Sequence, residues 1–119
     1  MTLDDLMGSF TIQGENQNAM KSSYSGTLEL SLNSDLQVVA NWQIGEEQTQ
    51  SGLGFYKDNI LVINFKYTGG DGARYYGTVV YKCVTKDVLV GFWSEELGDP
   101  AFLGTEKAYR IRSSQKILN

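Results

Sequence analysis

Two stretches of the chain, 51 residues apart, share one pattern of aromatic, glycine and threonine residues. Tyr-Ser-Gly-Thr at residues 24–27 recurs as Tyr-Tyr-Gly-Thr at residues 75–78, and in each copy a tryptophan, Trp42 or Trp93, follows the glycine by sixteen residues. An internal repeat constrains a fold more than any single motif does. This one predicts a small all-β barrel made of two similar halves, at about residues 24–56 and 75–109, within one domain spanning residues 1–119.

Turn residues divide the chain into short apolar segments about ten residues apart, which is typical of a β-sandwich or barrel. We expect one short helical turn at residues 3–7, with Thr2 as its cap. We expect eight strands, at about residues 8–15, 24–32, 36–44, 49–56, 60–67, 74–84, 87–94 and 101–112. The short links between them require antiparallel neighbours. An eight-stranded up-and-down barrel leaves no open sheet edge, and a two-sheet sandwich is the alternative.

Alternation of apolar and polar residues indicates which side chains point into the barrel. Both tryptophans fall on inward faces, next to the small residues Ala40 and Gly91. The other inward positions that we expect are Leu28, Leu30, Leu32, Leu36, Val38, Ile44, Phe55, Leu61, Ile63, Phe65, Tyr67, Val79, Tyr81, Cys83 and Leu89.

Composition excludes several classes of function. The net charge of −4 argues against nucleic acid as a partner, because phosphate binding needs a basic face. The chain has no histidine, which removes the commonest general base and the usual zinc and haem ligands. We therefore expect no metal, no cofactor and no enzyme, with a carboxylate-dependent enzyme kept as a third hypothesis. Nothing resembles a signal peptide or a membrane span, and the single cysteine, Cys83, favours a cytoplasmic location.

A few residues resemble the calycin group of barrels, which includes the lipocalins, the fatty-acid-binding proteins and the avidins. Gly8-Ser9-Phe10 opens the first strand where that group usually has Gly-x-Trp, and Arg110 or Arg112 lies where an arginine commonly packs across that aromatic residue. Length, strand count, the Gly-Thr dipeptides and the strand-end tryptophans look most similar to avidins. The resemblance implies a fold whose members bind small molecules inside the barrel. The polar residues that contact biotin in avidins do not map onto this chain, so biotin binding is not implied.

The inward aromatic residues suggest a binding site for a small molecule. An eight-stranded barrel is just wide enough to be filled by side chains or to hold one small ligand. The ligand-binding residues that we expect are Trp42, Trp93, Tyr81, Phe55 and Phe65. The alternative is a packed interior, in which these residues form only a core and the protein is an acidic interaction module such as an inhibitor or assembly factor.

Two pairs of glutamates follow the two tryptophans and should meet at one end of the barrel. Glu46 and Glu47 follow Trp42, and Glu95 and Glu96 follow Trp93. An acidic rim near indole rings suits a cationic group, and oxygen ligands also suit Ca²⁺, although no calcium-loop spacing is present. The alternative is that these charges occupy solvated loops.

Some apolar residues should point outward. Val88, Val90, Phe92, Ile60 and Val62 fall on faces that alternation assigns to solvent. Such a stripe favours a homo-oligomer interface, and the alternative is that the N-terminal segment or the tail covers it.

The last strand does not show which of its faces is buried. If Glu106 and Arg110 point inward, they would form a buried charge pair near the barrel floor. If they point outward, Leu103, Tyr109 and Ile111 need another register. We expect Cys83 to be a small core residue, because a reactive thiolate needs an exposed, positive setting.

Overall fold

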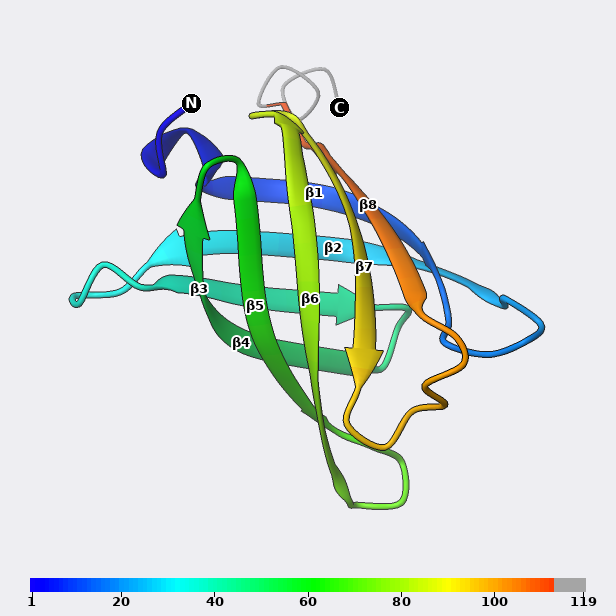
Figure 1. Ribbon diagram of the computed structural model, residues 1–119. Coiled ribbons are helices and arrows are strands. Elements are labelled where there is room, and N and C mark those ends of the chain that lie inside the picture. The colour runs from blue at the N-terminus through cyan, green and yellow to red at the C-terminus, as the bar shows by residue number, and fades with distance from the viewer. Residues whose placement is uncertain (113–119) are drawn as a thin grey trace.

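The computed structural model describes residues 1–112, and it is a closed antiparallel barrel of eight strands (Figure 1). A three-residue 3₁₀ helix, η1 (Asp4–Leu6), comes before the barrel. The strands are β1 (Gly8–Glu15), β2 (Ser23–Leu32), β3 (Val38–Ile44), β4 (Gln48–Lys57), β5 (Ile60–Thr68), β6 (Arg74–Thr85), β7 (Val88–Glu95) and β8 (Gly104–Arg110). No helix among the described residues is long and apolar enough to cross a membrane.

Each strand pairs with its neighbours in sequence, and β1 also pairs with β8 to close the barrel. In Figure 1 strands β1–β4 run across the view and β5–β8 run nearly at right angles to them. The up-and-down barrel predicted from the turns is therefore confirmed, in place of a sandwich. The two tryptophan hairpins are β2–β3, which carries Trp42, and β6–β7, which carries Trp93. They pair in one register: Leu28 faces Trp42, and Val79, which follows Leu28 by 51 residues, faces Trp93.

Most strand boundaries agree with the sequence prediction to within one residue. Three do not: the start of the third strand and both ends of the last strand, which ends at Arg110 rather than at residue 112. Leu36 was expected to open the third strand, but it has a φ of 61° and is exposed in the β2–β3 turn. The last strand begins at Gly104 rather than at residue 101, because Asp99 accepts backbone hydrogen bonds that fold residues 99–102 into a turn. Proline at position 100 favours such a turn.

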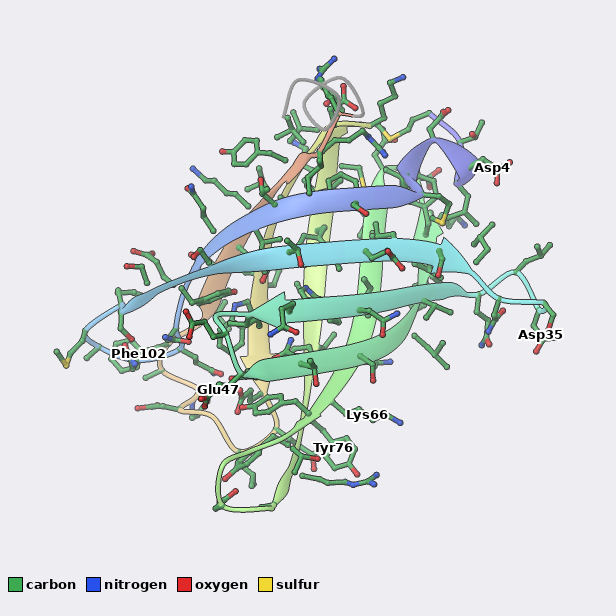
Figure 2. The ribbon with its side chains drawn as sticks, turned by 180° about the vertical axis from the view of Figure 1, so that it is seen from behind. Asp4, Asp35, Glu47, Lys66, Tyr76 and Phe102 are labelled. Carbon is green, nitrogen blue, oxygen red and sulfur yellow. The ribbon has the colours of Figure 1, made fainter. Side chains whose placement is uncertain are left out.

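One end of the barrel carries η1 and the β2–β3, β4–β5 and β6–β7 turns, and the other carries the four remaining loops. We call these the helix end and the loop end. The loops at the loop end are residues 16–22, 45–47, 69–73 and 96–103. Figure 2 shows Asp4 and Asp35 at the helix end and Glu47 and Phe102 at the loop end.

The interior is apolar through most of its length. Leu28, Leu30, Val38, Ala40, Leu61, Ile63, Val79, Tyr81, Cys83 and Leu89 are all buried, as expected. Burial raises the pKa of the Cys83 thiol to about 11, so the thiol stays protonated and serves as a small core residue.

Strand β4 corrects one part of the prediction. Phe55 was expected inside, but it points outward and 61% of it is exposed. The inward positions of β4 are held by Gln48, Gln50 and two glycines, Gly52 and Gly54. A Cβ at either glycine would collide with a side-chain atom of Ile63. Glycine is therefore needed where β5 packs its large side chains against the β4 backbone.

The helix end is closed by an arginine that lies across an aromatic ring. The guanidinium carbon of Arg110 lies 4.7 Å from the centre of the Phe10 ring. Its nitrogens donate to the carbonyl oxygens of Met7 at 2.8 Å and Asp5 at 2.6 Å, and to Asp87 Oδ1 at 2.9 Å. The same arginine therefore ties η1, β8 and the β6–β7 turn together. The arginine-over-aromatic contact suggested by the calycin resemblance is present here.

This arrangement predicts that Arg110→Met destabilises the fold by about 2–4 kcal/mol, because it removes the donor to the Met7 and Asp5 carbonyl groups and one of the two arginine donors to the Asp87 carboxylate. Denaturant unfolding monitored by tryptophan fluorescence measures the change. Arg112→Met is the matched control: this side chain is 67% exposed, so its loss should cost less than about 1 kcal/mol. Equal losses in the two variants would contradict the assignment.

Candidate functional site

A cavity of about 200 Å³ lies inside the barrel toward the loop end. Six of its thirteen lining residues are aromatic, and amide and carboxyl groups lie among them. Its lining residues are Asn16, Tyr24, Trp42, Ile44, Gln48, Gln50, Phe65, Tyr67, Val79, Tyr81, Trp93, Glu95 and Glu106.

A buried glutamate forms the polar centre of this cavity. Glu106 is only 4% exposed, so the inward register of β8 is settled. Its Oε2 atom accepts hydrogen bonds from the Tyr81 hydroxyl and from the Trp42 indole nitrogen, the latter at 3.3 Å. Its Oε1 atom accepts a hydrogen bond of 2.8 Å from the Tyr24 hydroxyl. The charge pair with Arg110 that an inward register would allow does not form, because Arg110 lies at the helix end and bonds Asp87.

Trp93 joins the same network through a tyrosine. Its indole nitrogen donates to the Tyr24 hydroxyl at 2.9 Å, and Tyr24 in turn donates to Glu106. Both tryptophans are thus linked to one carboxylate, Trp42 directly and Trp93 through Tyr24. Every buried side-chain nitrogen or oxygen among the described residues has a hydrogen-bond partner, so the network holds these rings in fixed positions.

Burial controls the protonation of the groups in this network. It raises the pKa of Glu106 above the ordinary value of 4.5, although the bonds from Tyr81, Tyr24 and Trp42 act in the opposite direction. Burial, together with the nearby carboxyl group of Glu106, also raises the pKa values of Tyr24 and Tyr81. Both tyrosines therefore remain neutral hydrogen-bond donors at ordinary pH.

Phe65 lies between the two indoles. Its ring centre is 6.1 Å from that of Trp42 and 6.2 Å from that of Trp93, in edge-to-face geometry with both. Tyr67 stacks on Phe65 at 6.5 Å and donates its hydroxyl to Glu95 Oε1 at 2.5 Å. Aromatic faces and a second carboxylate therefore continue from the centre of the cavity toward the loop end.

Two glycines make room for this arrangement. A Cβ at Gly104 would collide with the Trp93 ring, and one at Gly91 would lie 2.8 Å from the Tyr81 ring. Gly91 makes space for Tyr81, which it faces across the β6–β7 ladder. Close approach of a ring to backbone is a situation that requires glycine.

Four of the five predicted ligand-binding residues lie together around the cavity, namely Trp42, Trp93, Tyr81 and Phe65. Phe55 is on the outer surface instead. Of the four rim glutamates only Glu95 lines the cavity. Glu46, Glu47 and Glu96 are exposed at the loop end, and Glu96 borders a hollow on the outer surface that also includes Lys66 and Tyr76 (Figure 2).

The predicted outer stripe does face outward. Val90, Phe92 and Ile60 are 38%, 49% and 39% exposed, while Val88 and Val62 are half-buried. Val62 and Phe92 both lie opposite Val80, so the stripe is continuous across β5, β6 and β7. The tail that could cover it includes residues 113–119, which lie outside the described residues.

Sequence reasoning missed the polar half of the cavity. Tyr24, Gln48, Gln50 and Glu106 line it, and none of them was predicted as a site residue. A signal was present for Tyr24, since it is part of the repeat. Within the described residues, no three cysteine, aspartate or glutamate side chains gather as they would around a metal ion.

The chain matches no protein-family model, and a comparison with curated proteins also gives no match. Solved structures do match it. A redesigned β-barrel, mFAP0, bound to DFHBI has a TM-score of 0.67 and 18% identity, over 89% of this chain and 99% of that one. A related structure, EF1p2_mFAP2b bound to DFHBI, has a TM-score of 0.67 and 14% identity, over 91% of this chain and 95% of that one.

A third similar structure comes from the de novo design of a fluorescence-activating β-barrel, with a TM-score of 0.60 and 14% identity, over 91% of this chain and 95% of that one. The shared fold is a closed eight-stranded β-barrel. At these identities the likeness shows the fold alone, because one fold carries many functions.

The raised pKa of Glu106 predicts how stability depends on pH. Its folded-state pKa lies above the unfolded value, so its stabilising effect is full below about pH 4.5 and is lost as pH rises through the folded-state pKa. Each unit of pKa difference corresponds to about 1.4 kcal/mol. The variant E106Q has no ionisable group at this position, so its free energy of unfolding should not show the decrease that Glu106 causes as pH rises.

The amide can be accommodated, because the Tyr24 hydroxyl lies 3.3 Å from the Thr105 carbonyl oxygen and can donate there instead. Urea unfolding of both proteins from about pH 4 to about pH 8 measures the difference. Parallel stability curves would show that Glu106 titrates normally.

Proposed function

We propose that this protein is a small-molecule-binding barrel and that its site is the cavity around Trp42, Trp93, Tyr81 and Phe65. The observation that supports this most is the space itself, which side chains of an eight-stranded barrel could have filled. The wall combines eight aromatic or aliphatic side chains with five that carry amide or carboxyl groups, and such a combination of apolar surface and fixed polar groups is found in ligand sites. Similar barrels bound to DFHBI show that this fold accommodates a ligand.

The size of the cavity limits the ligand. Sites for drug-sized molecules measure roughly 300–1,000 Å³, and this one is about 200 Å³. We therefore propose a ligand of about one ring with a short polar group. The acidic interaction module, kept above as the alternative, assumed a packed interior, and the cavity argues against that assumption.

We add proposals on the origin of the fold, the role of the protein, its location and its partners. We propose that the two tryptophan hairpins are copies of one unit, given their matching register, and that the chain is related to the calycin barrels, given Arg110 over Phe10. We also propose a binding role rather than catalysis, a cytoplasmic location and no nucleic-acid or membrane partner. Finally, we propose self-association through the outer stripe of Val88, Val90, Phe92, Ile60 and Val62.

Filling the cavity should abolish binding. Val79 is buried in the cavity wall, whereas Val80, the next residue, points outward. We expect Val79→Phe to weaken binding of benzamide, measured by quenching of tryptophan fluorescence, by at least about tenfold, or about 1.4 kcal/mol. Val80→Phe, the matched control, should leave it unchanged.

Circular dichroism verifies that both variants are folded, and Gln50→Phe replaces Val79→Phe if the latter does not fold, since Gln50 also lines the cavity. No response of the wild-type protein to benzamide, benzamidine or DFHBI would contradict the proposed function.

The outer stripe has its own test. We expect the wild-type protein to form a dimer or larger species by light scattering, and Phe92→Asp to convert it to a monomer, because a charge cannot be buried unpaired in an interface. Leu97→Asp is the control, since Leu97 is 82% exposed in the β7–β8 loop, away from the stripe. A wild-type monomer would contradict self-association.

A further inference from the structure

The carboxyl group of Glu106 is buried without a cation beside it. All three of its hydrogen-bond donors, Tyr81, Trp42 and Tyr24, are neutral. The two side-chain ion pairs found within residues 1–112 both involve Asp87, at the helix end. Buried charges in proteins are normally paired, so an ionised Glu106 would lack the usual compensation.

The cavity beside Glu106 is acidic and contains no basic side chain. Its thirteen lining residues include two glutamates, Glu106 and Glu95, and no lysine or arginine. An ionised carboxylate offers about four acceptor positions, and the three bonds to Glu106 leave one for a ligand. Glu95 likewise accepts one side-chain hydrogen bond, from Tyr67.

The aromatic wall also favours positive charge. Indole and phenol faces attract cations, by about 0.5–2 kcal/mol depending on desolvation. Trp42, Trp93, Tyr24, Tyr67 and Phe65 surround the same space. At about 200 Å³ that space is much larger than a bare metal ion needs, and it suits an organic molecule.

We propose that the cavity binds a small organic cation, an amine or amidine with an apolar or aromatic body, whose N–H group donates to Glu106. The body then lies against Phe65 and the two indoles, and the end of the ligand nearest the loops lies beside Glu95. This inference rests on the proposed function, since it names the class of ligand for the same cavity.

Binding of a cation should be coupled to the protonation of Glu106. Burial favours the neutral form of Glu106 in the empty cavity, and a bound cation favours the ionised form. Binding of a cation must therefore release a proton at acidic pH, and its affinity must increase with pH until Glu106 is ionised in the free protein. A neutral ligand does not need Glu106 to be ionised, so its affinity should not increase with pH in this way.

Benzamidine and benzamide make a suitable pair of probes, because they have the same shape and differ in charge. Isothermal titration calorimetry at about pH 8 should show that the wild-type protein binds benzamidine at least about tenfold more tightly than benzamide. In E106Q this preference should disappear. E96Q is the matched control, because Glu96 directly follows β7 at the loop end, is exposed and does not line the cavity, and it should retain the preference.

The wild-type protein alone provides a second test that needs no folded variant. Between about pH 5 and about pH 8 benzamidine keeps its charge, so a rise in its affinity with pH, and none for benzamide, reports ionisation of the cavity. Equal binding of the two probes, or a preference for benzamide, would overturn the cation assignment while leaving the proposed function standing. Failure of both probes and of DFHBI to bind would instead count against the proposed function.

Discussion

The hydrogen bonds to the Glu106 carboxyl group are the interaction on which the rest of the cavity depends. A carboxyl group 4% exposed is costly unless its oxygens are bonded. Tyr81 from β6, Trp42 from β3 and Tyr24 from β2 all donate to it from across the barrel. Each of those bonds fixes a ring that would otherwise be free to fill the interior. The cavity is therefore held open by polar contacts between its walls.

At each end of the barrel, one polar side chain joins separate segments through hydrogen bonds. At the helix end, Arg110 bonds backbone carbonyls and Asp87 and packs on Phe10, so its charge is compensated and the end is closed. At the loop end, Gln17 bridges the first and last loops by donating to Phe102 O at 2.8 Å and accepting from the Glu95 backbone at 2.9 Å. A positive charge thus closes one end, while the charged residues that line the cavity toward the other end, Glu95 and Glu106, are both acidic.

Sequence patterning predicted the barrel and the inward tryptophans because apolar and polar residues alternate regularly along β3, and the 51-residue repeat extends the same register to Trp93 on β7. It failed on β4, where Gln48, Gln50 and two glycines face inward and Leu53 and Phe55 face outward. Apolar residues do not point inward on this strand for two reasons. Its first half lines the polar part of the cavity, where Gln48 and Gln50 face inward, and its second half packs glycine against Ile63. The role of Glu106 could not be predicted either, because its partners are 25 to 82 residues away in sequence and meet only when the barrel closes.

The most direct test of this account is the ionisation of Glu106 itself, observed through the ¹³C resonance of its carboxyl group during a pH titration by NMR. The account predicts a midpoint above 4.5 in the free protein and a lower midpoint when benzamidine is bound. A midpoint at the ordinary value, unchanged by benzamidine, would contradict both the uncompensated burial of this group and its role in binding a cation.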